Sequence, residues 1–164
     1  MTPELHRPVA IDRFGAAGLD VTVEATAAEC SALARRMTVP SISSLTCRFR
    51  VERESATTFL AHGHLLAHIV QICVVSLEEF AATVEERFSI RFVPEGEESD
   101  DDDPEAIDEI TYEGGAIDLG EAAAEQLGLA LDPYPRAPGA ELPEFEDGGE
   151  DHQFAALAAL KRPH

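Results

Sequence analysis

The chain has 164 residues and a formal net charge of −20 at pH 7, which fits one modest domain with its own core. Residues 92–164 carry 3 basic and 21 acidic side chains, a net of −18, whereas residues 1–91 carry 9 and 11, a net of −2. A surface this acidic disfavours phosphate backbones and anionic membranes as main partners and favours a basic protein.

The cysteines and the hydropathy pattern indicate the compartment in which the protein is expected. Cys30, Cys47 and Cys73 are widely spaced and form no CxxC pair, which argues against a disulfide framework and an intact zinc knuckle. No apolar run reaches the roughly 18 residues that a membrane span needs, and the first residues do not resemble a secretory signal. We therefore expect a cytoplasmic protein with reduced thiols, no membrane partner and no cofactor.

The first predicted elements are two short strands, at residues 9–11 and 19–23. Gly15 and Gly18 lie between them and are typical of turns, so the sequence predicts a hairpin or the start of a meander.

A helix is predicted next, from Thr26 to about Met37. Thr26 and Glu29 have the spacing of a capping box, in which each side chain bonds an amide at the start of the helix. The residues at helical spacing predict a buried stripe of Cys30, Leu33, Ala34 and Met37.

Three longer strands follow, because apolar residues alternate with polar ones from about residue 45 to residue 92. The second strand places His62, His64 and His68 on one face. Histidines at this spacing could share a zinc ion, but no carboxylate or cysteine joins them locally, so we predict no metal site. The pattern predicts an α+β fold with a mostly antiparallel sheet and helices against one face; a barrel-like closure is the alternative.

The acidic tract at residues 94–113 has few apolar residues and no periodicity, which predicts a flexible insertion. Its acidic centre consists of Glu97, Glu98, Asp100, Asp101, Asp102 and Asp103. The tract either binds a partner or only keeps the protein soluble.

A second helix is predicted after the tract, with Asp118 as its N-cap, Glu121 at the capping-box position and an end at Asp132 and Pro133. Its predicted docking face is Leu119, Ala123, Leu127, Ala130 and Leu131. We expect residues 1–135 to form a single domain. Residues 136–164 would then be a linker and a short C-terminal amphipathic helix, whose apolar positions are Phe154, Leu157 and Leu160.

Several of these segments, in this order, resemble the YceD family. The positions that carry the resemblance are Gly63, Gln71, Cys73, Ile117, Asp118, Leu119, Leu131 and Pro133, with the closing segment at residues 154–161. The resemblance implies a non-enzymatic factor needed for accumulation of large-subunit ribosomal RNA, and hence for biogenesis of the large ribosomal subunit.

The chain departs from the family pattern at one point. In the family pattern, many members carry a C-x-R-C pair at the position that resembles Cys73 here, with further cysteines after the second helix. This arrangement is suited to zinc. Here Ser76 stands where the second cysteine would be, and no cysteine follows. We therefore expect Cys73 to be a buried remnant without metal.

Charge and resemblance together favour one function and leave two alternatives. The favoured hypothesis is that the chain binds a basic ribosomal protein or assembly factor. The residues predicted to bind it are Glu97, Glu98, Asp100, Asp101, Asp102, Asp103, Asp118, Glu121 and Glu125.

The first alternative is direct RNA binding through a basic sheet face. That face would carry Arg48, Arg50, Arg87 and Arg91. The inward position predicted for the phenylalanines of these strands weakens this alternative, because bases stack on exposed rings. The least favoured alternative is a metal-dependent hydrolase with clustered carboxylates, since consecutive aspartates in an unstructured run are not held in a fixed geometry.

Overall fold

The computed structural model describes residues 3–100 and 102–140. Its elements, in chain order, are β1 (Pro8–Ala10), a 3-10 helix (Ile11–Arg13), β2 (Leu19–Glu24), α1 (Ala27–Met37), β3 (Ser41–Arg53), β4 (Phe59–Ile72), β5 (Glu79–Pro94), β6 (Asp108–Tyr112), β7 (Ala116–Asp118) and α2 (Leu119–Ala130).

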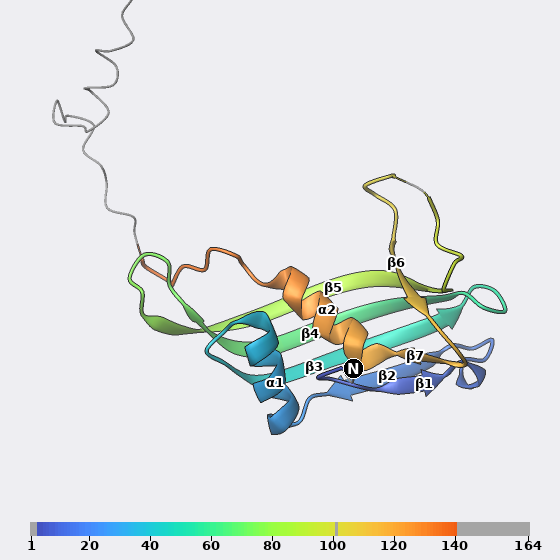
Figure 1. Ribbon diagram of the computed structural model, residues 1–164, viewed down its shortest axis with the longest axis horizontal. Coiled ribbons are helices and arrows are strands. Elements are labelled where there is room, and N and C mark those ends of the chain that lie inside the picture. The colour runs from blue at the N-terminus through green and yellow to red at the C-terminus, as the bar shows by residue number, and fades with distance from the viewer. Residues whose placement is uncertain (1–2, 101, 141–164) are drawn as a thin grey trace, which may run out of the picture.

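One five-stranded sheet dominates the structure, in the order β2-β3-β4-β5-β6 (Figure 1). Its first three pairings are antiparallel and the last, β5 with β6, is parallel. The α+β class and the mostly antiparallel sheet are therefore confirmed. Within the described ranges β2 and β6 are open edges that do not pair with each other, so the sheet does not close into a barrel.

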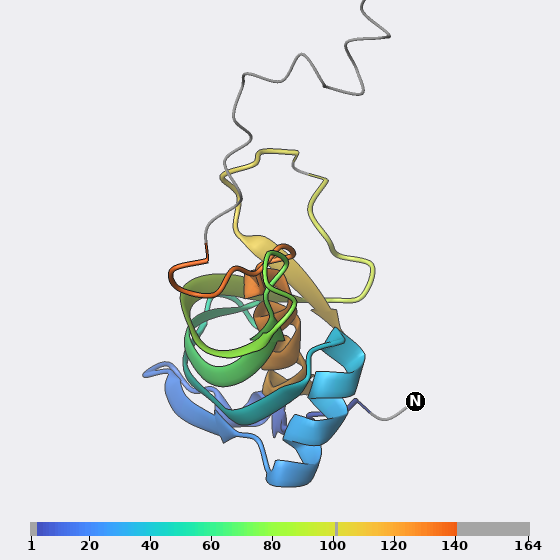
Figure 2. The same cartoon turned by 90° about the vertical axis from the view of Figure 1, so that its left-hand side faces the viewer.

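The helices cover one face of this curved sheet, as the side view shows (Figure 2). The predicted alternation explains this, because Leu45, Cys47, Phe49 and Val51 of β3 are all buried and the residues between them are largely exposed. The corresponding side chains of β4 join them, and Leu33 of α1 and Leu127 of α2 complete the core. The opposite face of the sheet, hereafter the outer face, carries no helix formed by residues 3–100 or 102–140.

The predicted capping box of α1 is present. The Thr26 amide donates to the Glu29 carboxylate over 2.8 Å, and the Glu29 amide donates to the Thr26 hydroxyl over 3.2 Å. Cys30, Leu33 and Ala34 are buried as predicted, and burial raises the pKa of the Cys30 thiol. Both guanidinium nitrogens at the end of Arg7 also donate to Glu29, over 2.8 and 2.7 Å, so the cap fastens the N-terminal segment to α1.

This ion pair predicts a pH-dependent contribution to stability. The Arg7 guanidinium, and then the Thr26 amide and hydroxyl, lower the pKa of Glu29 from 4.5 to about 2. A depressed carboxyl pKa stabilises the fold fully above the unfolded value, and the stabilisation is lost as the pH falls from 4.5 towards 2. We expect the free-energy difference between the wild type and Glu29→Gln in urea unfolding to shrink over this range. Arg7→Gln should reproduce the trend; a difference that is equal at pH 3 and pH 7 would contradict it.

The predicted hairpin of the first two strands is wrong. β1 pairs with β7 instead, with Val9 opposite Ile117, and the Ile11 amide donates to the Gly115 carbonyl. β2 pairs with β3, with Val21 opposite Phe49. A three-residue strand has too few local contacts to choose its neighbour, so its partner is set by where the connection from β6 brings the chain back.

The predicted flexible insertion is too long at its C-terminal end. Residues 108–112 form β6, which pairs with the end of β5 and places Ile110 opposite Phe92. Tyr112 packs against Phe59, with ring centroids 6.1 Å apart. These two apolar residues alternate with exposed polar ones, but the surrounding charge hides this short pattern. Flexibility of the remaining part of the tract stays a prediction.

The N-cap of α2 is confirmed and its capping box is not. The Asp118 carboxylate accepts hydrogen bonds from the amides of Gly120 and Glu121, but the Glu121 carboxylate turns to Arg36 of α1, at 2.9 Å. On the docking face, Leu119, Ala123 and Leu127 are buried, whereas Ala130 is only half-buried and Leu131 lies just beyond the helix. The predicted C-terminal helix at residues 154–161 lies outside the described residues.

Candidate functional site

An acidic loop joins β5 to β6 and extends away from the sheet (Figures 1 and 2). Its described acidic side chains are all exposed, and they comprise Glu95, Glu97, Glu98, Asp100, Asp102, Asp103 and Glu105; Asp101 lies outside the described residues. The loop makes a few bonds of its own: the Ser99 amide donates to Glu109 over 2.7 Å, and the Glu105 amide donates to Asp103 over 3.0 Å. We call residues 95–107 the acidic loop.

Negative charge is crowded where the acidic loop leaves the sheet. The Glu95 amide donates to the Tyr112 carbonyl, which brings Glu95 beside Glu113. A hydrogen bond with the Glu113 carboxyl and the repulsion between the two charges raise the pKa of Glu95. A cation placed here would relieve this repulsion.

The three acids predicted to bind a partner from α2 differ in availability. The Asp118 carboxylate accepts a hydrogen bond from the His6 ring over 2.5 Å and another from the Arg7 amide over 2.8 Å, and it also caps α2. Glu121 is engaged with Arg36. Glu125 is exposed and forms no ion pair within the described residues, and partial desolvation together with the charge of Glu121 raises its pKa. Of these three, Glu125 alone presents an uncommitted carboxylate.

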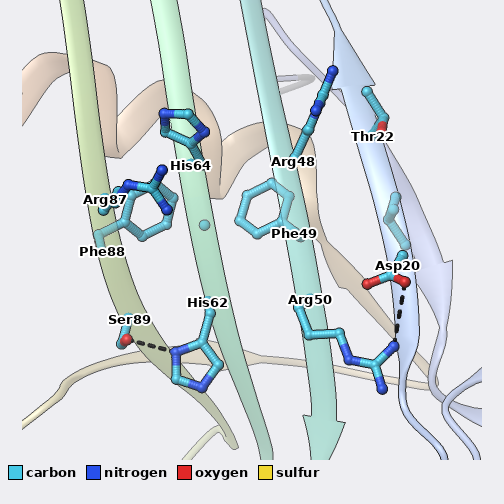
Figure 3. Close-up of a pocket in the computed structure, with 12 residues that line it drawn as sticks. Asp20, Thr22, Arg48, Phe49, Arg50, His62, His64, Arg87, Phe88 and Ser89 are labelled. Carbon is cyan, nitrogen blue, oxygen red and sulfur yellow. Dashed lines mark hydrogen bonds and ion pairs between the residues drawn. The ribbon is translucent and has the colours of Figure 1, made fainter.

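A groove of about 570 Å³ crosses the outer face of the sheet (Figure 3). Its floor is one row of the sheet register, in which Val21, Phe49, Gly63 and Phe88 lie side by side on β2 to β5. On the helix side of the sheet, an aromatic pair packs against Gly63. A Cβ atom there would lie 2.2 Å from the Phe88 ring, which packs edge-on against Phe49. We call this feature the transverse groove.

The two rows beside the floor form the walls of the transverse groove. One wall is Asp20, Arg50, His62 and Ser89, and the other is Thr22, Arg48, His64 and Arg87. Three arginines and two histidines thus face a single carboxylate, Asp20, in a chain that is acidic as a whole. The alternation of residues predicts Arg48, Arg50 and Arg87 on one face, but the alignment of two complete rows depends on the strand register.

The guanidinium groups of the transverse groove are not equally engaged. Arg50 lies 3.3 Å from Asp20 and donates to the Ala17 carbonyl. Arg48 and Arg87 are exposed and make no hydrogen bond or ion pair with any residue that the structure describes. Arg91, the fourth arginine predicted for this face, lies outside the groove and pairs with Glu54 at 2.6 Å.

The three histidines of β4 face different partners on β5. His62 bonds Ser89, His64 bonds Glu85 and His68 bonds Thr83. Among the described residues no group of three or more potential metal ligands lies together.

The family-motif positions gather at two places. Ile117, Asp118 and Leu119 form the junction of β7 with α2. Gln71, Leu131 and Pro133 line a cavity of about 340 Å³ between the end of β4 and the segment after α2. Gly63 stands apart, in the floor of the transverse groove.

Cys73 ties the end of β4 to the segment after α2. It is buried as predicted, and its sulfur accepts from the Ser76 amide at 3.5 Å and the Ala137 amide at 3.4 Å. Hydrogen bonds from Ala137, and then from Ser76, lower the pKa of this thiol to about 7. Leu77 follows with a positive φ of 61°. Backbone donors thus surround a sulfur that has no second cysteine beside it within the described residues, a polar setting that the sequence pattern does not predict.

The fold and these surfaces define the class of protein. It is an α+β protein with helices on one face of its sheet, an arginine-lined groove on the other face and an acidic loop at the β5–β6 connection. Within the described part of the chain, no helix is both long and apolar enough to cross a membrane.

The family model described as "Large ribosomal RNA subunit accumulation protein YceD" matches residues 61–161, and the chain belongs to the YceD family. This match confirms the resemblance. The family is one of ribosome-accumulation factors and is not a known enzyme family. The matched range includes most of β4 and all of β5, the acidic loop and α2, while β2 and β3 precede it. No curated protein and no solved structure matches the chain.

Proposed function

We propose that this protein is a non-enzymatic factor in large ribosomal subunit biogenesis that acts by binding a basic ribosomal protein or assembly factor through the acidic loop. The observation that supports this most directly is the exposure of every described acid in the loop. The crowded pair of Glu95 and Glu113 adds to it, because a cationic partner would relieve a repulsion that the free protein carries.

The structure determines how this proposal should be tested. Deleting residues 95–113 would remove β6, and β5 and β6 are parallel, so their connection cannot be reduced to a tight turn. Neutralising the loop at constant length avoids both problems. The variant is E97Q/E98Q/D100N/D102N/D103N, in which the asparagine at position 103 keeps an oxygen for the Glu105 amide.

A matched control neutralises five exposed acids elsewhere: D12N/E24Q/E52Q/E78Q/E79Q. The two variants have the same net charge, so a difference between them reports position and not total charge.

The expected result concerns capture of proteins extracted from large ribosomal subunits. At low salt the wild type and the control should retain the most basic proteins, and the loop variant should retain about tenfold less, with capture by the wild type falling as salt rises. Quantitative mass spectrometry of the retained proteins measures this. Equal retention by both variants would show that the acidic loop acts only on solubility.

A further inference from the structure

The transverse groove carries positive charge that the proposed function does not use. Opposite charges in facing positions of neighbouring strands stabilise a sheet, and like charges there destabilise it. Here the row Arg48, His64, Arg87 places a guanidinium group on either side of β4 with no acid between them. Glu85, which bonds His64, comes from the next row, where it faces Leu66.

We propose that the transverse groove binds the phosphate groups of single-stranded RNA that lies across β2 to β5. The proposal deepens the proposed function, and rests on it, by giving the same ribosomal factor a second partner. Guanidinium groups recognise phosphate oxygens with two parallel hydrogen bonds. Arg48 and Arg87 offer this geometry from strands that flank β4 (Figure 3).

The groove also has a shape and a lining suited to an extended polyanion. It is open, it spans four strands, and its floor is backbone with no protruding side chain because the Phe49 and Phe88 rings turn to the helix side around Gly63. The imidazole of His64 stands between Arg48 and Arg87, and that of His62 stands between Arg50 and Ser89; both provide flat surfaces on which a base can stack. Exposed phenylalanines are therefore not needed for this mode of binding.

The net charge of −20 does not prevent such binding. Interactions between exposed charges are largely screened beyond about 8 Å at physiological salt. The local field of the groove is therefore set by its lining and the groups in contact with it, where three arginines outnumber the two carboxylates of Asp20 and of Glu85, which bonds His64. The acidic loop leaves from the ends of β5 and β6 instead. The two charged features can thus hold different partners at the same time.

The test uses the full chain and a fluorescein-labelled single-stranded RNA of about twelve nucleotides, a length that spans several phosphate contacts. The variant R48A/R87A removes the two unpaired guanidinium groups. The control R13A/R35A removes two exposed arginines of the 3-10 helix and α1 that likewise form no ion pair in the described residues. Both changes lower the net charge equally, and thermal unfolding verifies that both variants fold.

The expected result is an affinity for RNA that falls about tenfold in R48A/R87A and by less than about twofold in the control. The slope of log K against log salt should become shallower by about 1.4, since each lost phosphate contact on a single strand removes about 0.7. R48K/R87K should give an intermediate affinity, because lysine keeps the positive charge but cannot form the two parallel hydrogen bonds of a guanidinium group.

Three outcomes would overturn the proposal: no RNA binding by the wild type at low salt, equal losses in the two alanine variants, or displacement of the RNA by a polyglutamate peptide of equal charge at equal concentration. The last would identify the groove as a site for acidic protein segments. Capture of basic proteins by R48A/R87A should stay at the wild-type level, so failure of this proposal and failure of the proposed function are distinguishable.

Discussion

Replacing Gly120 by alanine should destabilise the protein by about 3 kcal/mol, although alanine is the better helix former. A Cβ atom at this position would lie 2.7 Å from the Leu5 carbonyl oxygen and 2.8 Å from the Arg7 amide nitrogen. These are backbone atoms, so no change of rotamer relieves the overlap. The N-terminal segment would have to leave the start of α2, with loss of the bonds from the Leu119 amide to Arg7 and from the Arg7 amide to Asp118.

A matched control lies in the same helix. Gly128 is exposed, and a Cβ atom there meets only the end of the Met37 side chain, at 4.0 Å. Gly128→Ala should therefore stabilise the protein by about 0.5–1 kcal/mol through helix propensity alone. Urea unfolding followed by circular dichroism measures both changes. Equal effects of the two substitutions would show that the close approach at Gly120 does not constrain the fold.

Replacing Phe59 by alanine should cost about 3–5 kcal/mol, the largest loss we expect from one core side chain. Phe59 is fully buried and joins three parts of the chain. Its ring packs against Phe14 at 5.3 Å and Tyr112 at 6.1 Å between centroids, and the Arg53 guanidinium lies 5.0 Å above it. The truncation therefore leaves a cavity at the point where β4 meets both the N-terminal segment and β6.

Phe59→Leu separates the volume of this side chain from its aromatic contacts. It should cost about 1–2 kcal/mol, because leucine fills much of the space but makes neither the ring–ring nor the cation–π contact. The same unfolding measurement applies. A loss below about 1 kcal/mol for Phe59→Ala would mean that β6 and the N-terminal segment are held mainly by other contacts.

Local signals in the sequence predicted the parts of the fold that depend on near neighbours. The Thr26 and Glu29 spacing predicted the start of α1, and Asp118 predicted the start of α2, because a helix cap is satisfied within three residues. The alternation along β3 and β4 predicted which face is buried, since a strand has a period of two whatever its partner.

Features that depend on distant segments were not predictable in the same way. The pairing of β1 with β7 joins segments that have few local cues, and the predicted hairpin is wrong for that reason. β6 was not predicted, because Ile110 and Tyr112 are only two apolar residues in an acidic segment. The transverse groove needs the register of four strands, so the sequence indicated its arginines but not their alignment with His62 and His64.

The pairing of β1 with β7 also sets an order of events during synthesis. Arg7 bonds Asp118 across 111 positions of sequence, and buried Leu5 lies against the start of α2. The segment around β1 is thus among the last to find its place, because its partners are made more than a hundred residues later. Contacts this distant in sequence slow folding. Any chain cut short before residue 116 retains β1 with no strand to pair with, and the Arg7–Glu29 ion pair then holds the N-terminal segment without β7 and α2.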